Sequence, residues 1–415
     1  MRTRTLLLLA ALLPACGREP ALTWPDAPVV IVSIDTLRAD HLPVYGYAAG
    51  ATPRLDALAR EAVVFEDAYS HSPLTLPSHV SLFTGLLPLH HGVRDNIGFR
   101  LKPEAPTLAS RLKAAGWRTG GAVSAFVLRG ETGIGRGFEF YEDALTTRGG
   151  EESLSAMQRD GALAVEALTA WLARPGGVRA LAFLHLYEPH SPHAPPERHR
   201  RHPLPYDGEI AYADELLGRF LDALKAGGVY ERALVAVTSD HGEGLGDHGE
   251  QEHGIFLYRE ALRVPLLLRL PGGARGGTRV AGAVGLADLA PTLLDLLGQP
   301  RAGMDGASLR PALSSGRAEP RPVYAETMYP RYHFGWSELY SATGPRYRYI
   351  RAPRPELYDL AEDPRETRNL AARLPSAAAP MADWLEGRLA GAALGAPEAV
   401  PDEVRERLAA LGYLG

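Results

Sequence analysis

Cysteine is almost absent from this chain: Cys16 is the only one among 415 residues. A fold without a second cysteine cannot contain an internal disulfide. Positive charge is not in excess either, because 44 lysines and arginines face 49 aspartates and glutamates, which gives a formal net charge of -5. Proteins that bind a phosphate backbone usually present a basic face, so this composition gives no reason to expect a nucleic-acid partner.

Long apolar runs are missing as well. The run at residues 6–13 is too short to span a bilayer stably. Two arginines precede it and Pro14-Ala15-Cys16 follows it, which is the arrangement of a secretory signal. The letters LPAC resemble a bacterial lipobox, so we expect Cys16 to be a lipidated amino terminus after cleavage. The mature protein is then a periplasm-facing lipoprotein of the bacterial cell envelope, with a secreted protein as the alternative.

The rest of the chain contains short apolar runs, rich in β-branched residues, that are followed by polar side chains. Residues 28–34, PVVIVSI, and residues 233–237, ALVAV, predict buried parallel strands. Asp35 follows the first run, and Asp240 and His241 follow the second. Because ligands bind beyond the carboxyl ends of strands in an open α/β sheet, we expect these side chains to meet at one edge. The pattern indicates an α/β fold with a doubly wound, mostly parallel sheet.

A carboxylate beside an imidazole at a strand end can bind a divalent cation. We therefore predict that Asp35, Asp240 and His241 are metal ligands. The same loop holds three further candidates: Asp247, His248 and His253. The alternative is a polar loop whose histidines are only solvated, with Asp35 as a helix or turn cap.

A threonine lies near the start of a predicted helix in SPLTLPSHVSLFTG. Pro77 is tolerated in a first helical turn, and Gly85 can end the helix. Free N–H groups and the helix dipole near Thr75 favour an anion. A hydroxyl held beside both a cation and such a helix end can become a nucleophile toward phosphorus or sulfur. The alternative is that Thr75 simply caps the helix.

The segment TLPSHVSLFTG resembles the sulfatase signature, with Thr75 at the position of the nucleophile. Other segments resemble further blocks of that family in the same order: IVSIDTLRADHL, VTSDHGEGLGDHGE, YREALRVPLLL, LADLAPTLLDLLG and ELYDLAEDPRETRNL. The resemblance covers roughly residue 28 to the end of the chain. It implies a member of the alkaline phosphatase superfamily, whose enzymes transfer or hydrolyse phosphate and sulfate esters on a doubly wound sheet.

The chain departs from the sulfatase pattern at the site itself. Sulfatases use a formylglycine made from Cys or Ser, whereas oxidation of the secondary alcohol of Thr75 would give a ketone. His79 stands in place of the signature arginine, and Thr36 stands in place of the usual second aspartate. His253 aligns with the family's late lysine, and a Lys-any-His motif is missing from GGAVSAFVL. The usual supports of a formylglycine and a sulfate group have therefore changed together.

The replacements resemble a different set within the superfamily. Asp35, Thr75, Asp240 and His241 are similar to one metal site of threonine-nucleophile members, such as nucleotide pyrophosphatase/phosphodiesterases and lipoteichoic acid synthases. An imidazole ligand suits Mn or Zn better than Ca, although Ca stays possible. We expect one ion, with a second one left open.

The expected function is metal-dependent hydrolysis of phosphate or sulfate esters with Thr75 as nucleophile, and phosphate monoesters or diesters are favoured. Three alternatives stay open. One is an arylsulfatase-like sulfuric ester hydrolase that uses unmodified threonine. The others are an envelope phosphoglycerol or phosphoethanolamine transferase, and a lipoprotein that only binds a ligand.

Further histidines and polar residues are candidates for catalysis and substrate contact. His190 matches the family's Pro-His position, where an imidazole holds the substrate or protonates the leaving oxygen. His253 is the second catalytic candidate. Substrate contact is predicted for five residues: His79, Arg94, Asn96, His193 and His333.

Several of these residues also have a structural interpretation. Arg94 and Asn96 could instead only pin the turn that follows residues 90–92. His193 could be a supporting or surface group. The aromatic segment that contains His333 could be core, because aromatic residues in such runs are more often buried.

The composition changes near residue 310, where a segment rich in aromatics, glycine and proline predicts short antiparallel strands. We expect a signal peptide over residues 1–16, a linker over 17–27, a sulfatase-like catalytic domain over 28–309 and a small α+β domain over 310–415. The small domain should include a helix over residues 380–389. The expected substrate is a small-molecule or glycan ester, and membrane contact would occur only through the lipid anchor.

Overall fold

A computed structural model describes residues 22–145 and 160–399, so the predicted signal peptide and Cys16 lie outside the described residues. The larger part of the fold is an eight-stranded sheet with the order β4-β3-β5-β1-β6-β7-β2-β8. β7 pairs antiparallel with β6 and β2, and the other strand pairs are parallel. The strands are β1 (Val29–Ile34), β2 (Val63–Tyr69), β3 (Arg118–Ala122), β4 (Phe140–Glu142), β5 (Ala180–Leu186), β6 (Leu234–Thr238), β7 (Arg263–Arg269) and β8 (Arg279–Gly285).

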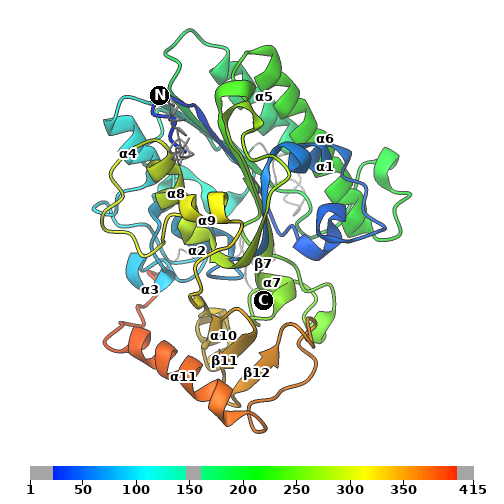
Figure 1. Cartoon of the computed structure of the whole chain (residues 1–415), viewed down its shortest axis with the longest axis vertical. Helices are drawn as coiled ribbons and strands as arrows, with labels where there is room; N and C mark the ends of the chain where they lie inside the picture. Colours follow the sequence, from blue (N-terminus) through cyan, green and yellow to red (C-terminus); the bar gives the residue numbers. More distant parts are fainter. Residues whose placement is uncertain (1–21, 146–159, 400–415) are drawn as a thin grey trace, which may run out of the picture.

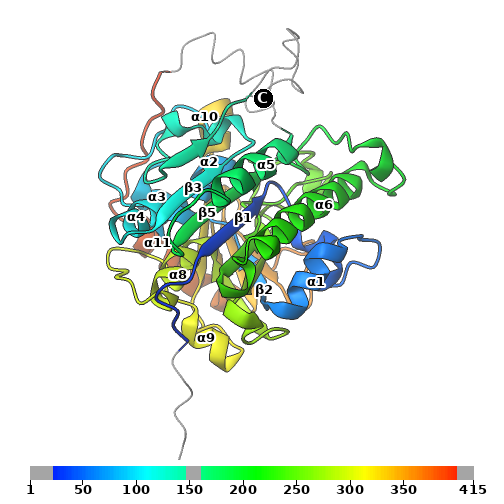
Figure 2. The ribbon, with the colours of Figure 1, turned by 90° about the horizontal axis from the view of Figure 1, so that it is seen from above.

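Helices cover both faces of this sheet (Figures 1 and 2). All six residues of β1 are buried, and alternate side chains point to opposite faces. Val29 and Ile31 therefore join one apolar core, whereas Val30 and Val32 join the other. The first core is closed by α2 (Thr75–Thr84), α4 (Leu108–Ala114), α8 (Leu289–Leu296) and α9 (Arg310–Ser315), and the second by α1 (Pro53–Glu61), α5 (Gly161–Leu172) and α6 (Pro205–Ala226). The predicted doubly wound α/β fold is confirmed.

A smaller antiparallel sheet with the order β12-β11-β10-β9 lies at one end of the large sheet (Figure 1). Its elements are β9 (Val323–Thr327), α10 (Tyr329–Phe334), β10 (Leu339–Thr343), β11 (Tyr347–Arg351), β12 (Glu356–Asp359) and α11 (Pro375–Leu389). Residue 310, where the composition changes, is the first residue of α9, which packs in the first core of the large sheet. The predicted helix over residues 380–389 is confirmed as the later part of α11.

The small sheet contacts loops at the carboxyl ends of the large sheet's strands. The hydroxyl of Thr327 donates a hydrogen bond to the carbonyl of Gly254, and the hydroxyl of Tyr258 donates to Glu356. Two short helices, α3 (Pro88–His91) and α7 (Arg259–Leu262), complete this end of the molecule. Within residues 22–145 and 160–399, no helix has both the length and the apolar character that crossing a membrane requires.

The predicted strands that carry the candidate site are confirmed to within one residue. β1 ends at Ile34, so Asp35 follows it, and β6 ends at Thr238, two residues before Asp240. β1 and β6 are parallel neighbours, with Ser33 opposite Thr238. The two carboxylates therefore lie at the same edge of the sheet, as the strand-end argument predicts.

Candidate active site

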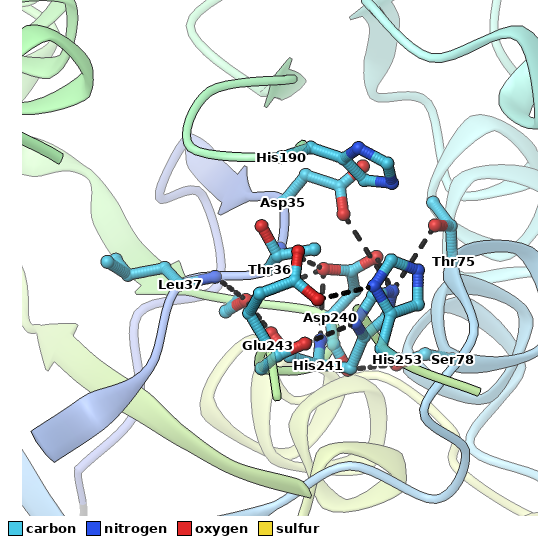
Figure 3. A network of polar contacts seen from close by, with 12 residues as sticks. Asp35, Thr36, Leu37, Thr75, Ser78, His190, Asp240, His241, Glu243 and His253 are labelled. Carbon is cyan, nitrogen blue, oxygen red and sulfur yellow. Dashed lines mark hydrogen bonds and ion pairs between the residues drawn. The ribbon is translucent and has the colours of Figure 1, made fainter. Parts of the chain in front are cut away.

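Three distant segments place four polar side chains around one point (Figure 3). Asp35 follows β1, Asp240 and His241 follow β6, and Thr75 is the first residue of α2. The Nε2 atom of His241 lies 3.3 Å from Thr75 Oγ1, 3.4 Å from Asp240 Oδ2 and 3.8 Å from Asp35 Oδ1. All four residues are fully buried. The structure thus brings together the four residues predicted to form a metal site.

The hydrogen bond of His241 to the main chain decides which of its nitrogens faces the site. Nδ1–H donates to the carbonyl of Gly242 at 2.9 Å. Burial and the neighbouring His253 lower the pKa of His241 well below its usual range, so the ring is neutral. Nε2 therefore presents its lone pair to Thr75 and the two carboxylates, which is the form of histidine that binds metals.

The two carboxylates have oxygen atoms that the protein does not pair. Among the described residues, neither oxygen of Asp35 has a hydrogen-bond partner, and Oδ2 of Asp240 has none. Burial raises the pKa of Asp35 to about 7, and burial together with Asp35 raises the pKa of Asp240 well above its usual range. Buried carboxylates without partners are costly unless a cation compensates them. With His241 they form a group whose ligand atoms lie close enough to hold a metal ion, so these residues fit a divalent cation.

Thr75 does not cap its helix. The N-cap of α2 is Leu74, which makes no side-chain capping bond, and the hydroxyl of Thr75 faces His241 instead. The first turn is held by Asn96, whose Oδ1 accepts a hydrogen bond from Leu76 N–H at 2.8 Å. His79 Nδ1–H donates to the carbonyl of Thr75 at 2.8 Å. The threonine hydroxyl is therefore positioned at a helix amino terminus beside the candidate metal ligands.

Thr36 replaces the aspartate that is usual after the first strand, and its backbone is strained. Its φ of 54° lies in the left-handed region, which β-branched residues rarely adopt. Its N–H donates to Asp240 Oδ1 at 3.3 Å, and Tyr206 O–H donates to its carbonyl at 2.6 Å. Its hydroxyl is buried, and no described residue bonds to it. This conformation helps to fix the carboxylate of Asp240.

His253 is paired with Glu243, a buried carboxylate that the sequence did not single out. His253 Nδ1–H donates to Glu243 Oε1 at 3.0 Å. Burial lowers the pKa of His253, but the charge and hydrogen bond of Glu243 outweigh it and raise the pKa to about 9. The ring of His253 lies 4.3 Å from that of His241. An imidazolium therefore occupies the position where the resemblance expects a lysine.

His190 lies beside His253, at a ring distance of 5.1 Å. Its Nδ1 lies 2.8 Å from the hydroxyl of Tyr187 and 2.6 Å from the carbonyl of Ser191. Burial and the charge of His253 lower the pKa of His190 to about 4. Of the two predicted catalytic histidines, His253 is charged at neutral pH and His190 is neutral.

Comparison with known proteins decides the family. The sulfatase family model matches residues 28–299, and the model of the C-terminal part of N-sulphoglucosamine sulphohydrolase matches residues 246–390. The chain belongs to the sulfatase family. Enzymes of this family are metal-dependent ester hydrolases, and the close grouping of the ligand atoms of Asp35, Asp240 and His241 agrees with that chemistry.

Two curated relatives and one solved structure illustrate the similarity. The Delta 4,5-hexuronate-2-O-sulfatase of Bacteroides thetaiotaomicron is 24% identical over 407 residues, which cover 82% of this chain and 84% of that protein. The choline-sulfatase of Rhizobium meliloti is 27% identical over 433 residues, which cover 83% and 82%. The phosphonate monoester hydrolase of Agrobacterium radiobacter shares the fold with a TM-score of 0.73 and 24% identity, over 88% of this chain and 95% of that one.

Some residues predicted to contact the substrate are bonded within the fold. Arg94 donates from Nε and Nη2 to both carboxylate oxygens of Glu326, each at 2.6 Å. His79 uses both nitrogens, because Nε2 also accepts a hydrogen bond from the hydroxyl of Ser33 at 2.9 Å. His333 Nε2 lies 3.1 Å from Asp95 Oδ2. His79 nonetheless borders the candidate metal site, with Nδ1 3.6 Å from Asp240 Oδ2, and ester contact by these three side chains stays a prediction.

Two residues of that group remain. Asn96 holds the first turn of α2 through Leu76 N–H, and His193 is partly exposed and packs against Tyr206 at a ring distance of 5.3 Å. Its Nε2 has no hydrogen-bond partner among the described residues. His185, by contrast, is fully buried beneath Asp35, with Nε2 3.4 Å from Asp35 Oδ2. Burial lowers the pKa of His185 to about 3, so it supports the carboxylate as a neutral ring.

Asp247 and His248, which were further metal candidates, have other partners. Arg38 Nη2 donates to Asp247 at 2.9 Å. His248 Nδ1 lies 2.5 Å from Glu260 Oε1, and its ring stacks on Tyr258 at 3.7 Å. Both residues therefore stabilise the loop through contacts within the protein. Their positions give no support for a second metal ion bound by Asp247 and His248.

We expect the stability that the His248–Glu260 pair contributes to be lost above neutral pH. The hydrogen bond to Glu260 raises the pKa of His248 from 6.5 to about 9. Because the pKa in the folded protein is the higher one, the contribution is complete below about pH 6.5 and disappears as the pH rises through about 9. Part of the ring is exposed, so we expect about 1 kcal/mol after solvent screening. Thermal unfolding should show a fall in Tm across this range that the His248→Gln variant lacks; equal falls in both proteins would contradict the assignment.

Proposed function

We propose that this sulfatase-family hydrolase cleaves phosphoesters with Thr75 as its nucleophile. The observation that carries the proposal is the position of Thr75 Oγ1, 3.3 Å from the lone-pair nitrogen of His241 and at the amino terminus of α2. Threonine acts unmodified here, because its secondary alcohol cannot give the aldehyde of a formylglycine. The unpaired oxygens of Asp35 and Asp240 support metal-dependent chemistry at the same point.

In this proposal, Asp35, Thr75, Asp240 and His241 hold one divalent ion. The imidazole favours Mn or Zn over Ca, which prefers oxygen ligands. When bound, such an ion lowers the pKa of the threonine hydroxyl and offsets the charge of the ester oxygens. The positive end of the α2 helix dipole, at Thr75, favours the same anion.

The residues suggest a two-step reaction. Thr75 Oγ1 releases its proton to solvent and bonds to phosphorus while the bond from phosphorus to the leaving oxygen breaks. His253, held as an imidazolium by Glu243, supplies a proton to that oxygen, so the alcohol leaves neutral. His190 stands beside it as a neutral ring that can orient the ester or the incoming water. Water then bonds to phosphorus and gives a proton to His253, which becomes an imidazolium again, while the bond from phosphorus to Thr75 Oγ1 breaks and the threonine oxygen regains a proton from solvent.

The charges of the site favour an ester with a single negative charge. Two carboxylates balance a divalent ion, and Glu243 balances His253. His79 and His253 stand in place of the arginine and lysine that would add positive charge in other sulfatases. His79 is neutral, because burial and His185 lower its pKa. A phosphodiester carries one charge at neutral pH and a phosphomonoester carries up to two. The proposal therefore favours diesters among the phosphoesters.

Hydrolysis of sulfate esters by unmodified Thr75 is the second candidate. It is favoured by the names of the curated relatives, which include a hexuronate sulfatase and a choline-sulfatase. A sulfate monoester also carries a single charge, so the charge balance allows it. The lipid anchor at Cys16 and a position facing the periplasm also stay proposals.

A set of esters with one leaving group separates these candidates. The purified protein, first stripped with a chelator, would be assayed with Mn, Zn or Ca on 4-nitrophenyl phosphate, bis(4-nitrophenyl) phosphate and 4-nitrophenyl sulfate. Because the leaving group is constant, differences in kcat/KM report the transferred group. We expect the diester to exceed the phosphomonoester by about tenfold, which corresponds to about 1.4 kcal/mol of differential binding in the transition state. A higher rate on the sulfate would support the second candidate, and equal rates with and without metal would contradict both.

A further inference from the structure

A cavity of about 370 Å³ lies between the loop after His253 and the small sheet. The loop contributes Ile255, Phe256 and Tyr258 to its wall. The small sheet and its α10 segment contribute Pro330, Trp336 and Leu339, among others. The volume falls within the range of sites that bind small molecules.

The wall of this cavity is mainly apolar. Two charged side chains, Arg354 and Glu356, also belong to it. The carboxylate of Glu356 already accepts hydrogen bonds from the hydroxyls of Tyr258 at 3.0 Å and Tyr358 at 2.8 Å. A ligand with several hydroxyl groups would therefore find few partners here, whereas an aryl or alkyl group would exchange water for apolar contact.

A short and well-fixed segment of chain joins the active site to the wall of the cavity. Ile255 is two residues after His253, so their Cα atoms are at most about 7 Å apart. The carboxylate of Glu250 accepts hydrogen bonds from the N–H groups of Ile255 at 2.7 Å and Phe256 at 3.3 Å. Thr327 O–H donates to the carbonyl of Gly254. The segment that begins at the catalytic imidazolium thus continues directly into the cavity wall.

Exposed aromatic rings gather at the same place. Trp336 is 60% exposed and Phe334 is 37% exposed, and their ring centroids are 4.9 Å apart. Trp336 belongs to the cavity wall. Large apolar side chains at the surface beside a cavity are typical of sites that bind an apolar ligand.

We propose that this cavity binds an apolar aryl or alkyl group on the alcohol side of the ester that reacts at Thr75. The inference rests on the proposed function, because it assumes an ester that is cleaved beside His253. The leaving oxygen lies next to His253, and its carbon substituent then follows the chain toward Ile255 and Trp336. The substrates are accordingly esters of hydrophobic alcohols.

Two variants test the cavity, with one matched control. Ala352→Trp adds a large side chain to the cavity wall, and Trp336→Ala removes the ring at the surface. Ala173→Trp is the control. It makes the same substitution as the first variant at an exposed residue, the C-cap of α5, which packs on the large sheet. The probe is 1-naphthol, an uncharged alcohol whose binding needs no turnover, measured by titration calorimetry on the full-length protein.

We expect the wild type and Ala173→Trp to bind 1-naphthol equally, with a negative heat-capacity change from apolar burial. Both cavity variants should weaken binding by about tenfold or more, in line with the apolar area lost. They should also raise KM for a naphthyl ester and leave KM for the corresponding methyl ester unchanged. Equal 1-naphthol affinity in all four proteins would overturn the inference. Because there are two cavity variants, the test still stands if one of them folds poorly.

The same measurements separate this inference from the proposed function. Binding of 1-naphthol that Ala352→Trp abolishes, in a wild type that cleaves no phosphate or sulfate ester, would support the cavity and reject the proposed function. Ester hydrolysis with the same KM for naphthyl substrates in the wild type and both cavity variants would support the proposed function and reject the cavity.

Discussion

Replacement of Thr75 by alanine should lower kcat by at least about 10³-fold on every ester that the protein hydrolyses, because the nucleophile is removed. The methyl group of alanine leaves the neighbouring helix contacts in place, since Thr75 bonds to His79 through its carbonyl. Thr75→Ser keeps the hydroxyl and should retain much of the activity. The measurement is kcat with saturating metal, together with mass analysis of acid-quenched protein for a phosphorylated peptide that contains Thr75.

Thr84 provides the control for this experiment, because it lies on the same helix and uses its hydroxyl within the fold. Its Oγ1–H donates to the carbonyl of Val80 at 2.6 Å. Thr84→Ala should therefore change stability slightly and leave kcat unchanged. Full activity in Thr75→Ala would exclude Thr75 as the nucleophile. A phosphorylated residue found elsewhere in the protein would identify the nucleophile.

The positions of the two carboxylates of the candidate metal site could be predicted because they follow from a local rule. Asp35 and Asp240 each follow a short apolar run, and parallel neighbouring strands bring such ends to one edge. No knowledge of the loops is needed for that step. The same reasoning does not extend along the loop after β6. Asp247 and His248 turn toward Arg38 and Glu260, although their residue types are as suitable for a metal as those that precede them.

Residues whose partners are distant in the sequence could not be assigned in this way. Arg94 is paired with Glu326, 232 positions later, so nothing near Arg94 indicates that its guanidinium is already bonded. Glu243 was missed for a related reason. Its sequence position shows a carboxylate in a glycine-rich loop, but its role depends on the fold turning it inward to His253. Long-range pairing of this kind becomes visible only in three dimensions.

The strained conformation of Thr36 shows what motif comparison leaves out. The sequence marks Thr36 only as a missing aspartate. The structure adds that its φ of 54° aligns its N–H with Asp240 and leaves its hydroxyl buried near the site. This conformation cannot be predicted from residue type, because β-branched residues such as threonine disfavour the left-handed region.

Asp240→Asn should abolish activity and also make the metal-free protein more stable. In the wild type, Oδ2 of Asp240 has no hydrogen-bond partner among the described residues, and burial with the charge of Asp35 raises its pKa well above the usual range. Asparagine keeps an oxygen for the N–H groups of Thr36 and His241, which now bond to Oδ1, and removes an ionisable group whose burial is costly. We expect the metal-free variant to gain about 1–3 kcal/mol over the metal-free wild type, and kcat to fall by at least about 10³-fold.

Metal should reverse the order of stability of these two proteins. A ligand that binds only the folded state adds about 2.7 kcal/mol at a hundred times its Kd, so Mn or Zn should raise the Tm of the wild type by several degrees. The Asp240→Asn variant has lost a ligand oxygen and should respond weakly. Asp222→Asn is the control, because Asp222 is exposed and forms an ion pair with the exposed Arg54; it should follow the wild type with and without metal. Equal stabilisation of all three proteins by metal would mean that the ion binds elsewhere, and the unpaired oxygens of Asp35 and Asp240 would then need another explanation.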